Sequence, residues 1–156
     1  MPPHTIHSRA NRNIKGRGNV VDNAIFKDYL AQIEQACKAG DVCVIITATN
    51  SFVTAPIARE FGIENLIATE PEHRGGEFTG NVASMPCFRE GKIACLESWL
   101  AAHGWALDSF ADSTFYSDSL NDLPLLAKVK HPVAANPDDT LRAHAEQHGW
   151  RIINLH

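Results

Sequence analysis

Apolar residues recur along the chain in two rhythms, and each rhythm predicts a different kind of element. Phe26, Ile33 and Cys37 belong to a series spaced by three and four residues, which is typical of one face of a helix. Val42 to Ile46 is instead a continuous apolar, β-branched run, as expected for a strand buried on both faces of a parallel sheet. A helix over 52–61 follows, so the first elements alternate between helix and strand.

The alternation continues to the end of the chain. The further predicted strands cover 66–69, 78–82, 115–117, 131–134 and 151–154, and the further helices cover about 92–103, 123–129 and 138–148. A turn at 73–77 makes 78–82 an antiparallel partner of the strand segment before it. Alternating strands and helices predict an α/β fold with a parallel sheet. Residues 1–19 are polar and aperiodic, so we expect a disordered or irregular segment over 1–24 and one domain over 25–156.

Composition and charge exclude some classes of function but do not indicate which one the chain has. The chain has 156 residues, of which 44% are hydrophobic and 21% charged, as in an ordinary globular protein. Its net charge of −4 offers no basic field for nucleic acid or an acidic membrane. The basic N-terminus has no apolar core of a secretory signal, so we expect a cytoplasmic location. The four cysteines show no C-x-x-C spacing and are expected to be reduced and packed.

Chemically useful side chains fall where predicted strands end and helices begin. Thr47 follows the strand 42–46, and Asp118, Asn121 and Asp122 follow the strand 115–117. Ligands of open α/β sheets bind at the carboxyl ends of the strands. Carboxylate and amide oxygens at this spacing suit Mg²⁺, and a hydroxyl with a lysine, Lys92, suits a phosphate group. A phosphate site with a metal ion is therefore one interpretation.

Each of these residues also has a simpler interpretation. Asp118, Asn121 and Asp122 are ordinary helix caps, and Thr47 is a candidate cap for the helix that follows it. Lys92 would serve equally as a solvated helix residue. His144 and His148 have the spacing of a metal-chelating pair, but surface residence is the favoured reading for both.

Order and spacing of three motifs resemble the haloacid dehalogenase-like (HAD) hydrolases, in their phosphoserine-phosphatase-like branch. The second motif of that family is similar to 45–52 (IITATNSF), the third to Lys92 within 90–93 (EGKI), and the fourth to 116–122 (YSDSLND). The resemblance runs from about Phe26 to His156. It implies a Rossmannoid three-layer sandwich and a Mg²⁺-dependent phosphomonoester hydrolase that acts on a small phosphorylated metabolite.

The resemblance also implies roles for individual residues. Thr47 and Lys92 would be the catalytic residues present, since they hold and neutralise the phosphoryl group. Asp118 and Asp122 would bind Mg²⁺, with Asp122 acting through water or by orienting the site. The residues implied to bind phosphate or substrate are Thr47, Ala48, Asn50, Lys92 and Asn121. In the family's reaction an aspartate attacks phosphorus and water hydrolyses the aspartyl-phosphate, which divides one hard step into two.

The motif that would carry this nucleophile is missing. The family's first motif, Asp-x-Asp, ends a central N-terminal strand and precedes a helical cap. Residues 1–25 contain a single aspartate, Asp22, with Ala24 where the second aspartate should stand. The resemblance therefore implies a fold without its first strand and most of its cap, and a chain inactive by itself.

A missing central strand would leave buried backbone groups unpaired in the two neighbouring strands. Three solutions are open: residues 19–24 fill part of the gap, the two strands close up, or a partner chain or second copy supplies a strand. Two classes of function are open as well. One is a phosphomonoesterase, and the other is a non-catalytic phosphate- or Mg²⁺-binding subunit that needs a partner.

Overall fold

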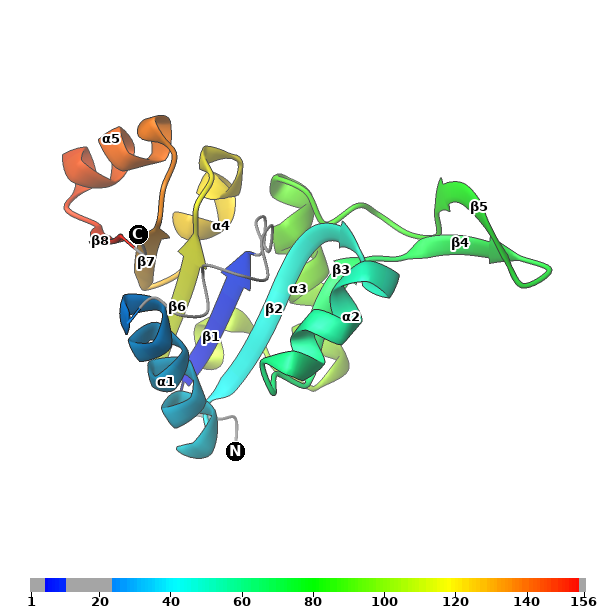
Figure 1. Ribbon diagram of the computed structural model, residues 1–156, viewed down its shortest axis with the longest axis horizontal. Coiled ribbons are helices and arrows are strands. Elements are labelled where there is room, and N and C mark those ends of the chain that lie inside the picture. Colours follow the sequence, from blue (N-terminus) through cyan, green and yellow to red (C-terminus); the bar gives the residue numbers. More distant parts are fainter. Residues whose placement is uncertain (1–4, 11–23, 155–156) are drawn as a thin grey trace.

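The structure, a computed structural model, describes residues 5–10 and 24–154, with side chains from residue 31 onward. Its strands are β1 Thr5–Ala10, β2 Val42–Asn50, β3 Asn65–Thr69, β4 Pro71–Arg74, β5 Glu77–Val82, β6 Asp112–Ser117, β7 His131–Ala135 and β8 Arg151–Ile153. Its helices are α1 Ala24–Lys38, α2 Ser51–Glu60, α3 Glu90–Ala102, α4 Leu123–Leu126 and α5 Asp139–His148, with short 3₁₀ turns at Leu107–Ser109 and Leu120–Asp122. The elements predicted over 25–154 are all present, with ends shifted by a few residues (Figure 1).

The main sheet has six strands in the order β3-β2-β1-β6-β7-β8, and every pairing within it is parallel. The predicted α/β class with a parallel sheet is therefore confirmed. A separate antiparallel hairpin, β4–β5, projects from the body of the molecule (Figure 1). The chain does return antiparallel after the turn, but the expected partner, the strand at 66–69, is wrong: β5 pairs with β4, Pro71–Arg74, while β3 pairs with β2.

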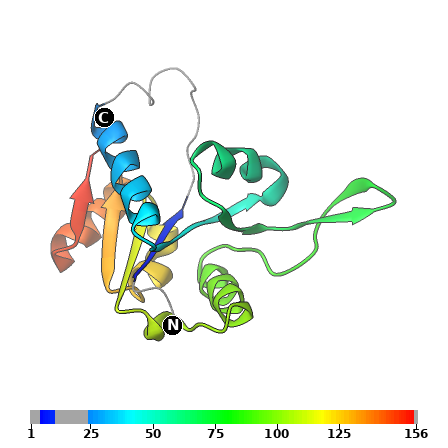
Figure 2. The same cartoon turned by 90° about the horizontal axis from the view of Figure 1, so that it is seen from below.

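Helices cover both faces of the sheet, which gives three layers (Figure 2). Side chains of β2 alternate between the two faces because successive residues of a strand point in opposite directions. Val42, Val44 and Ile46 pack with residues of α3, α4 and α5, while Cys43 and Ile45 pack with residues of α1 and α2. Both faces of β2 are therefore buried, as its continuous apolar run predicts.

A strand is present at the central position of the sheet. β1 lies between β2 and β6, with Ser8 opposite Val44 on one side and Phe115 on the other. The expectation of an open or closed-up centre is therefore wrong, and so is the expectation of disorder for residues 5–10; the remainder of 1–24 before α1 lies outside the described residues. The strand at the centre is formed by residues 5–10, and so neither by residues 19–24 nor by a partner chain. Thr5 to Ala10 lacks an apolar run, and its pairing with β2 and β6 is what places it in the sheet.

The cysteines are paired, which corrects the expectation of reduced thiols. Cys37 forms a disulfide with Cys43, and Cys87 forms one with Cys95. In each pair the Cα atoms are 6.0 Å apart, inside the range that a disulfide can bridge. The sequence spacing hid these pairs because each joins a helix to a segment packed against it, which only the fold brings together.

We expect reduction to lower stability through both disulfides by similar amounts. Each closes a short loop, of sequence separation 6 and 8, and loop-closure entropy for such lengths is worth about 2–3 kcal/mol. Urea unfolding of the oxidised chain and of the variants Cys37→Ser/Cys43→Ser and Cys87→Ser/Cys95→Ser measures each contribution. Superimposable unfolding curves, together with four titratable thiols in the untreated protein, would contradict the pairing.

Candidate phosphate-binding site

The carboxyl ends of the parallel strands share one edge of the sheet, and the predicted site residues gather there. Thr47 lies in the last part of β2, and Asp118 directly follows β6. The first turn of α3 brings Lys92 to the same region, since Lys92 contacts Asp122 in the turn after β6. Three segments far apart in the sequence therefore meet at one edge, as the motif order predicts.

A buried ion pair forms the centre of the site. Lys92 Nζ lies 2.6 Å from Asp122 Oδ1, and their side chains are only 5% and 3% exposed. Ser117 Oγ donates to the other carboxylate oxygen, Asp122 Oδ2, at 2.6 Å. Both oxygens of Asp122 thus have partners, and the carboxylate is fixed against β6. Asp122 fixes the ammonium in turn, which makes it a positioning group for Lys92.

The turn after β6 is ordered by its serines. Ser117 Oγ accepts from the backbone N–H of Ser119, and Ser119 Oγ accepts from that of Asn121. The carbonyl of Asp118 accepts from the backbone N–H of Asp138, which ties this turn to the start of α5. Such local side-chain bonds hold an irregular backbone that neither helix nor sheet would satisfy.

Asp118 is the residue of this turn that fits a metal ion. Its Oδ1 atom is buried at the carboxyl edge of the sheet, and carboxylate oxygen is a ligand that Mg²⁺ prefers. Asp122 fits less well as a direct ligand because its two oxygens already bind Lys92 and Ser117. Within the described residues no three His, Cys, Asp or Glu side chains are grouped to hold a metal. Mg²⁺ commonly takes one or two carboxylates and completes its shell with water and phosphate oxygens.

The last residues of β2, which run directly into α2, place a hydroxyl and backbone groups at this edge. Thr47 is 1% exposed, and its Oγ1 accepts from the backbone N–H of Thr49 at 3.1 Å. Asn50 is the N-cap of α2, where its Oδ1 accepts from the backbone N–H of Val53. Its side-chain oxygen is therefore engaged in capping, while Ala48 is exposed and presents its backbone. The cap of α2 is therefore Asn50, and Thr47 does not serve as that cap.

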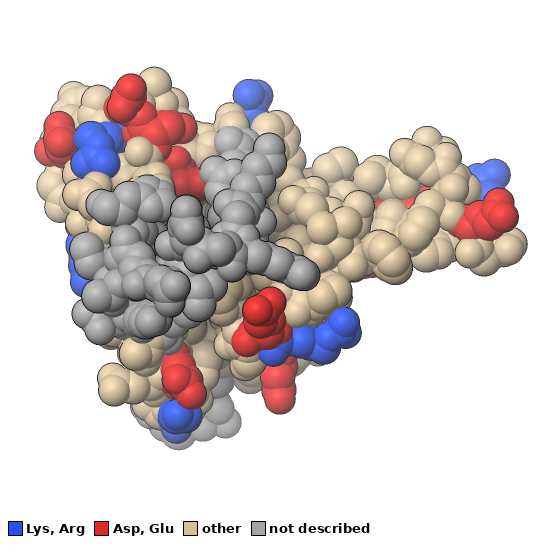
Figure 3. Space-filling view, viewed as in Figure 1, with Lys and Arg blue, Asp and Glu red and all other residues tan. Residues whose placement is uncertain are grey.

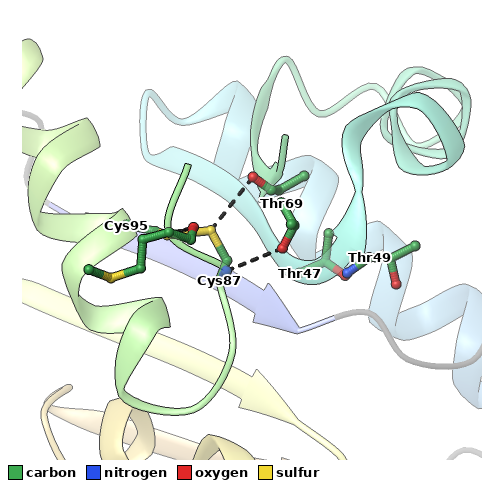
Figure 4. The surroundings of a disulfide bond; sticks show 7 residues. Thr47, Thr49, Thr69, Cys87 and Cys95 are labelled. Atoms are coloured by element: carbon green, nitrogen blue, oxygen red, sulfur yellow. Dashed lines mark hydrogen bonds between the residues drawn. A yellow bond between two sulfur atoms is a disulfide. The ribbon is translucent and has the colours of Figure 1, made fainter. Parts of the chain in front are cut away.

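Cys87 links the end of β3 to α3. The backbone N–H of Cys87 donates to Thr69 Oγ1 at the end of β3, at 3.2 Å, and Cys87 is bonded to Cys95 within α3 (Figure 4). Thr47 lies beside this group in the same view. Cys87, in the segment that leads into Lys92, is thus fastened both to β3 and to α3.

Several of these residues carry no sequence signal of their own. Ser117 matters only because it faces Asp122, and Thr69 only because Cys87 passes it. Arg89 was also missed; its Nε lies 3.4 Å from Asn121 Oδ1 at the rim of the site. A useful signal was available for Arg89, since it stands three residues before Lys92 at the start of the same helix.

The histidine pair lies outside this group. His144 and His148 stack on each other with ring centroids 4.0 Å apart, and both contact Trp150. His148 is exposed on α5, as its surface assignment predicts.

On the face of the molecule seen in Figure 3, acidic and basic side chains are interspersed among uncharged ones. The helices of the described ranges are all too short or too polar to cross a bilayer.

Comparison with known proteins identifies what this arrangement resembles. The family described as haloacid dehalogenase-like hydrolase matches residues 6–127. The chain is 46% identical over 118 residues to a histidinol-phosphatase of Neisseria meningitidis, covering 75% of this chain and 53% of that protein. It is 38% identical over 114 residues to phosphoserine phosphatase SerB1 of Mycobacterium tuberculosis, covering 73% of this chain and 36% of the relative.

A solved structure from Bordetella pertussis, of a protein with unknown function, superposes with a TM-score of 0.81 at 49% identity. The match covers 88% of this chain and 62% of that one. The chain therefore spans about half the length of the first of these curated relatives and less of the second. The activities in these names are those of the longer relatives as whole proteins.

Proposed function

This chain belongs to the haloacid dehalogenase-like hydrolases, and we propose that it holds the phosphate-binding half of a Mg²⁺-dependent phosphomonoester hydrolase. The observation that carries the proposal is the buried Lys92–Asp122 pair at the carboxyl edge of the sheet, the edge to which β2 also brings the buried Thr47. A buried ammonium is costly unless its charge is used or paired. Here it is both paired and placed where this class of sheet binds ligands.

The residues present divide the work of holding a phosphate group. Thr47 donates a hydrogen bond from its hydroxyl to a phosphoryl oxygen, and Lys92 neutralises negative charge on the phosphate group. Asp122 and Ser117 keep Lys92 in place, and Asp118 would hold Mg²⁺. The ion would supply charge neutralisation at the phosphoryl oxygens, which is the main requirement of phosphoryl transfer.

The nucleophile is what this strand arrangement lacks. β1 occupies the central position, and its residues, Thr5 to Ala10, include neither Asp nor Glu. No carboxylate from β1 can therefore attack phosphorus. We propose that the chain by itself binds phosphate without hydrolysing phosphomonoesters, and that it would act as a binding subunit unless a carboxylate reaches the site from elsewhere.

For the substrate, we propose a small amino-alcohol phosphate. Support comes from the names of two relatives, a histidinol-phosphatase and a phosphoserine phosphatase, because both names denote a phosphate ester that bears an amino group. A carboxylate is available to meet an ammonium at the rim: Glu70 Oε2 accepts from Ser51 Oγ at 2.7 Å, at the start of α2. Glu70 is exposed, and Ser51 is the first residue of α2, four residues after Thr47.

Phosphate binding without turnover is the expected result for the purified chain. Calorimetric titration with inorganic phosphate should show binding that tightens when Mg²⁺ is added, while p-nitrophenyl phosphate is not hydrolysed above background. Thr47→Val should weaken phosphate binding about tenfold or more, since a hydrogen bond to a charged group is worth about 1.5–3 kcal/mol. Asp118→Asn should abolish the effect of Mg²⁺, which we expect to bind only at millimolar concentrations because one carboxylate is available to it.

Two controls accompany this titration. Thr49→Val changes the exposed neighbour of Thr47 and should leave binding unchanged, and Thr47→Ser should restore it because the hydroxyl is kept. An absence of phosphate binding would overturn the proposed function. Mg²⁺-dependent hydrolysis that Asp118→Ala abolishes would show instead that a residue outside β1 attacks phosphorus.

A further inference from the structure

Arg89 stands at the entrance of α3 with a backbone conformation that L residues rarely adopt. Its φ is 50° and its ψ is −123°, and such positions persist only where the surroundings hold them. The surroundings here are tight. The backbone N–H of Lys92 donates to the carbonyl of Arg89, and a Cβ added to Gly91 would lie 2.3 Å from the carbonyl oxygen of Pro86. With Cys87 fastened to Thr69 and Cys95, this turn has little freedom to relax.

The conformation places a guanidinium at the rim of the phosphate site. Arg89 Nε lies 3.4 Å from Asn121 Oδ1, in the turn after β6, and its Cζ atom lies 5.2 Å from the centre of the Phe88 ring. The side chain is exposed, and among the described side chains no carboxylate forms an ion pair with it. Asn121 orients one edge of the guanidinium, which leaves its two terminal nitrogens to meet a ligand.

A guanidinium would add to the groups already assigned to the phosphate. The Lys92 ammonium is in contact with Asp122, so part of its charge is used within the protein. A guanidinium presents paired N–H donors that match two oxygens of a phosphate, and it stays charged at any working pH.

We propose that Arg89 is an additional anion-binding residue of this site, which contacts the phosphoryl oxygens from the solvent side while Asn121 orients it. The proposal rests on the proposed phosphate-binding function and adds a residue to it. It also gives Asn121 a role: Asn121 acts on the phosphate through Arg89 and is a positioning residue.

Calorimetric titration of the full chain with inorganic phosphate tests this assignment. Arg89→Gln should weaken phosphate binding about tenfold, and Arg89→Lys should recover part of the loss because a point charge remains without the paired donors. The matched control is Arg59→Gln, which removes an exposed arginine in the last turn of α2 and should change the affinity less than twofold. Equal affinities for Arg89→Gln and Arg59→Gln would overturn the proposal.

A glycine variant separates binding from folding. Arg89→Gly removes the guanidinium and also relieves the positive φ, so we expect a higher urea midpoint together with weaker phosphate binding. Weaker binding accompanied by a lower midpoint would mean that the turn has merely been damaged, and would count against the proposal.

Two further readouts identify which assumption fails. If the wild-type chain does not bind inorganic phosphate, the proposed function itself is wrong. If Arg89→Gln weakens binding of phosphoserine but not of inorganic phosphate, Arg89 recognises the substrate's carboxylate and its assignment to the phosphoryl group is wrong. A parallel loss for both ligands is the expected result.

Discussion

Asp122→Ala should destabilise the chain by about 3–5 kcal/mol, because it removes the carboxylate that pairs with the buried Lys92 ammonium. The two side chains are 5% and 3% exposed, so water cannot replace the lost carboxylate without opening the site. For a domain of this size each kcal/mol shifts the melting temperature by about 2–4 °C, so the expected drop is about 10 °C. Urea unfolding and thermal unfolding monitored by circular dichroism measure both quantities.

The control for this variant is a second ion pair that involves α3, the helix that carries Lys92. Glu97 in α3 bonds to Lys128, but the two side chains are 52% and 42% exposed. Glu97→Ala should therefore cost no more than about 1 kcal/mol. The double variant Asp122→Leu/Lys92→Met should regain much of the stability lost in Asp122→Ala, since it removes both buried charges. If Asp122→Ala and Glu97→Ala behave alike, the central pair is not buried as described.

Ser8→Pro should destabilise the chain by about 3 kcal/mol, because β1 is paired on both sides. Ser8 lies opposite Val44 and Phe115, whose side chains are 1% and 0% exposed. Proline has no N–H to donate, and an unpaired backbone group in such surroundings costs about 1–3 kcal/mol before the ring displaces its neighbours. Hydrogen exchange in β2 and β6 should accelerate along with the loss of stability.

Ser8→Ala keeps the N–H and is expected to lie within about 1 kcal/mol of the wild type, so it isolates the backbone effect. An unchanged unfolding free energy for Ser8→Pro would show that residues 5–10 do not lie in the sheet. The centre of the sheet would then need another occupant, and a partner-supplied strand would return as the leading explanation.

Sequence patterns predicted the elements that carry a recognisable apolar pattern. They missed β1, which carries none. β2 was predictable because both of its faces face helices, which demands a continuous apolar run. β1 was not, because Thr5-Ile6-His7-Ser8 has neither an apolar run nor a usual alternation. The motif that usually marks this strand is also absent, so resemblance to the family pointed away from it.

The candidate site also divides into residues that the sequence predicted and contacts that only the fold reveals. Thr47, Lys92 and Asp118 were found because residue type, element boundary and motif order agree, although their roles remain predictions. The contacts of Asp122 were not predictable, because a carboxylate four residues after Asp118 fits a metal ion and an ammonium equally well. Only the fold brings Lys92 within 2.6 Å of it and decides which partner the carboxylate has.

The position of β1 also sets the order in which this sheet can be completed. Among the described strands β1 comes first in the sequence, yet one of its two neighbours, β6, follows only after β2, the hairpin and α3. Until residues 112–117 leave the ribosome, the edge of β1 that faces β6 lacks the partner that it has in the structure. Pairings between such distant segments are slow to form, and an open strand edge recruits other chains in the meantime. Synthesis through β6 is therefore the interval in which this chain is most exposed to aggregation.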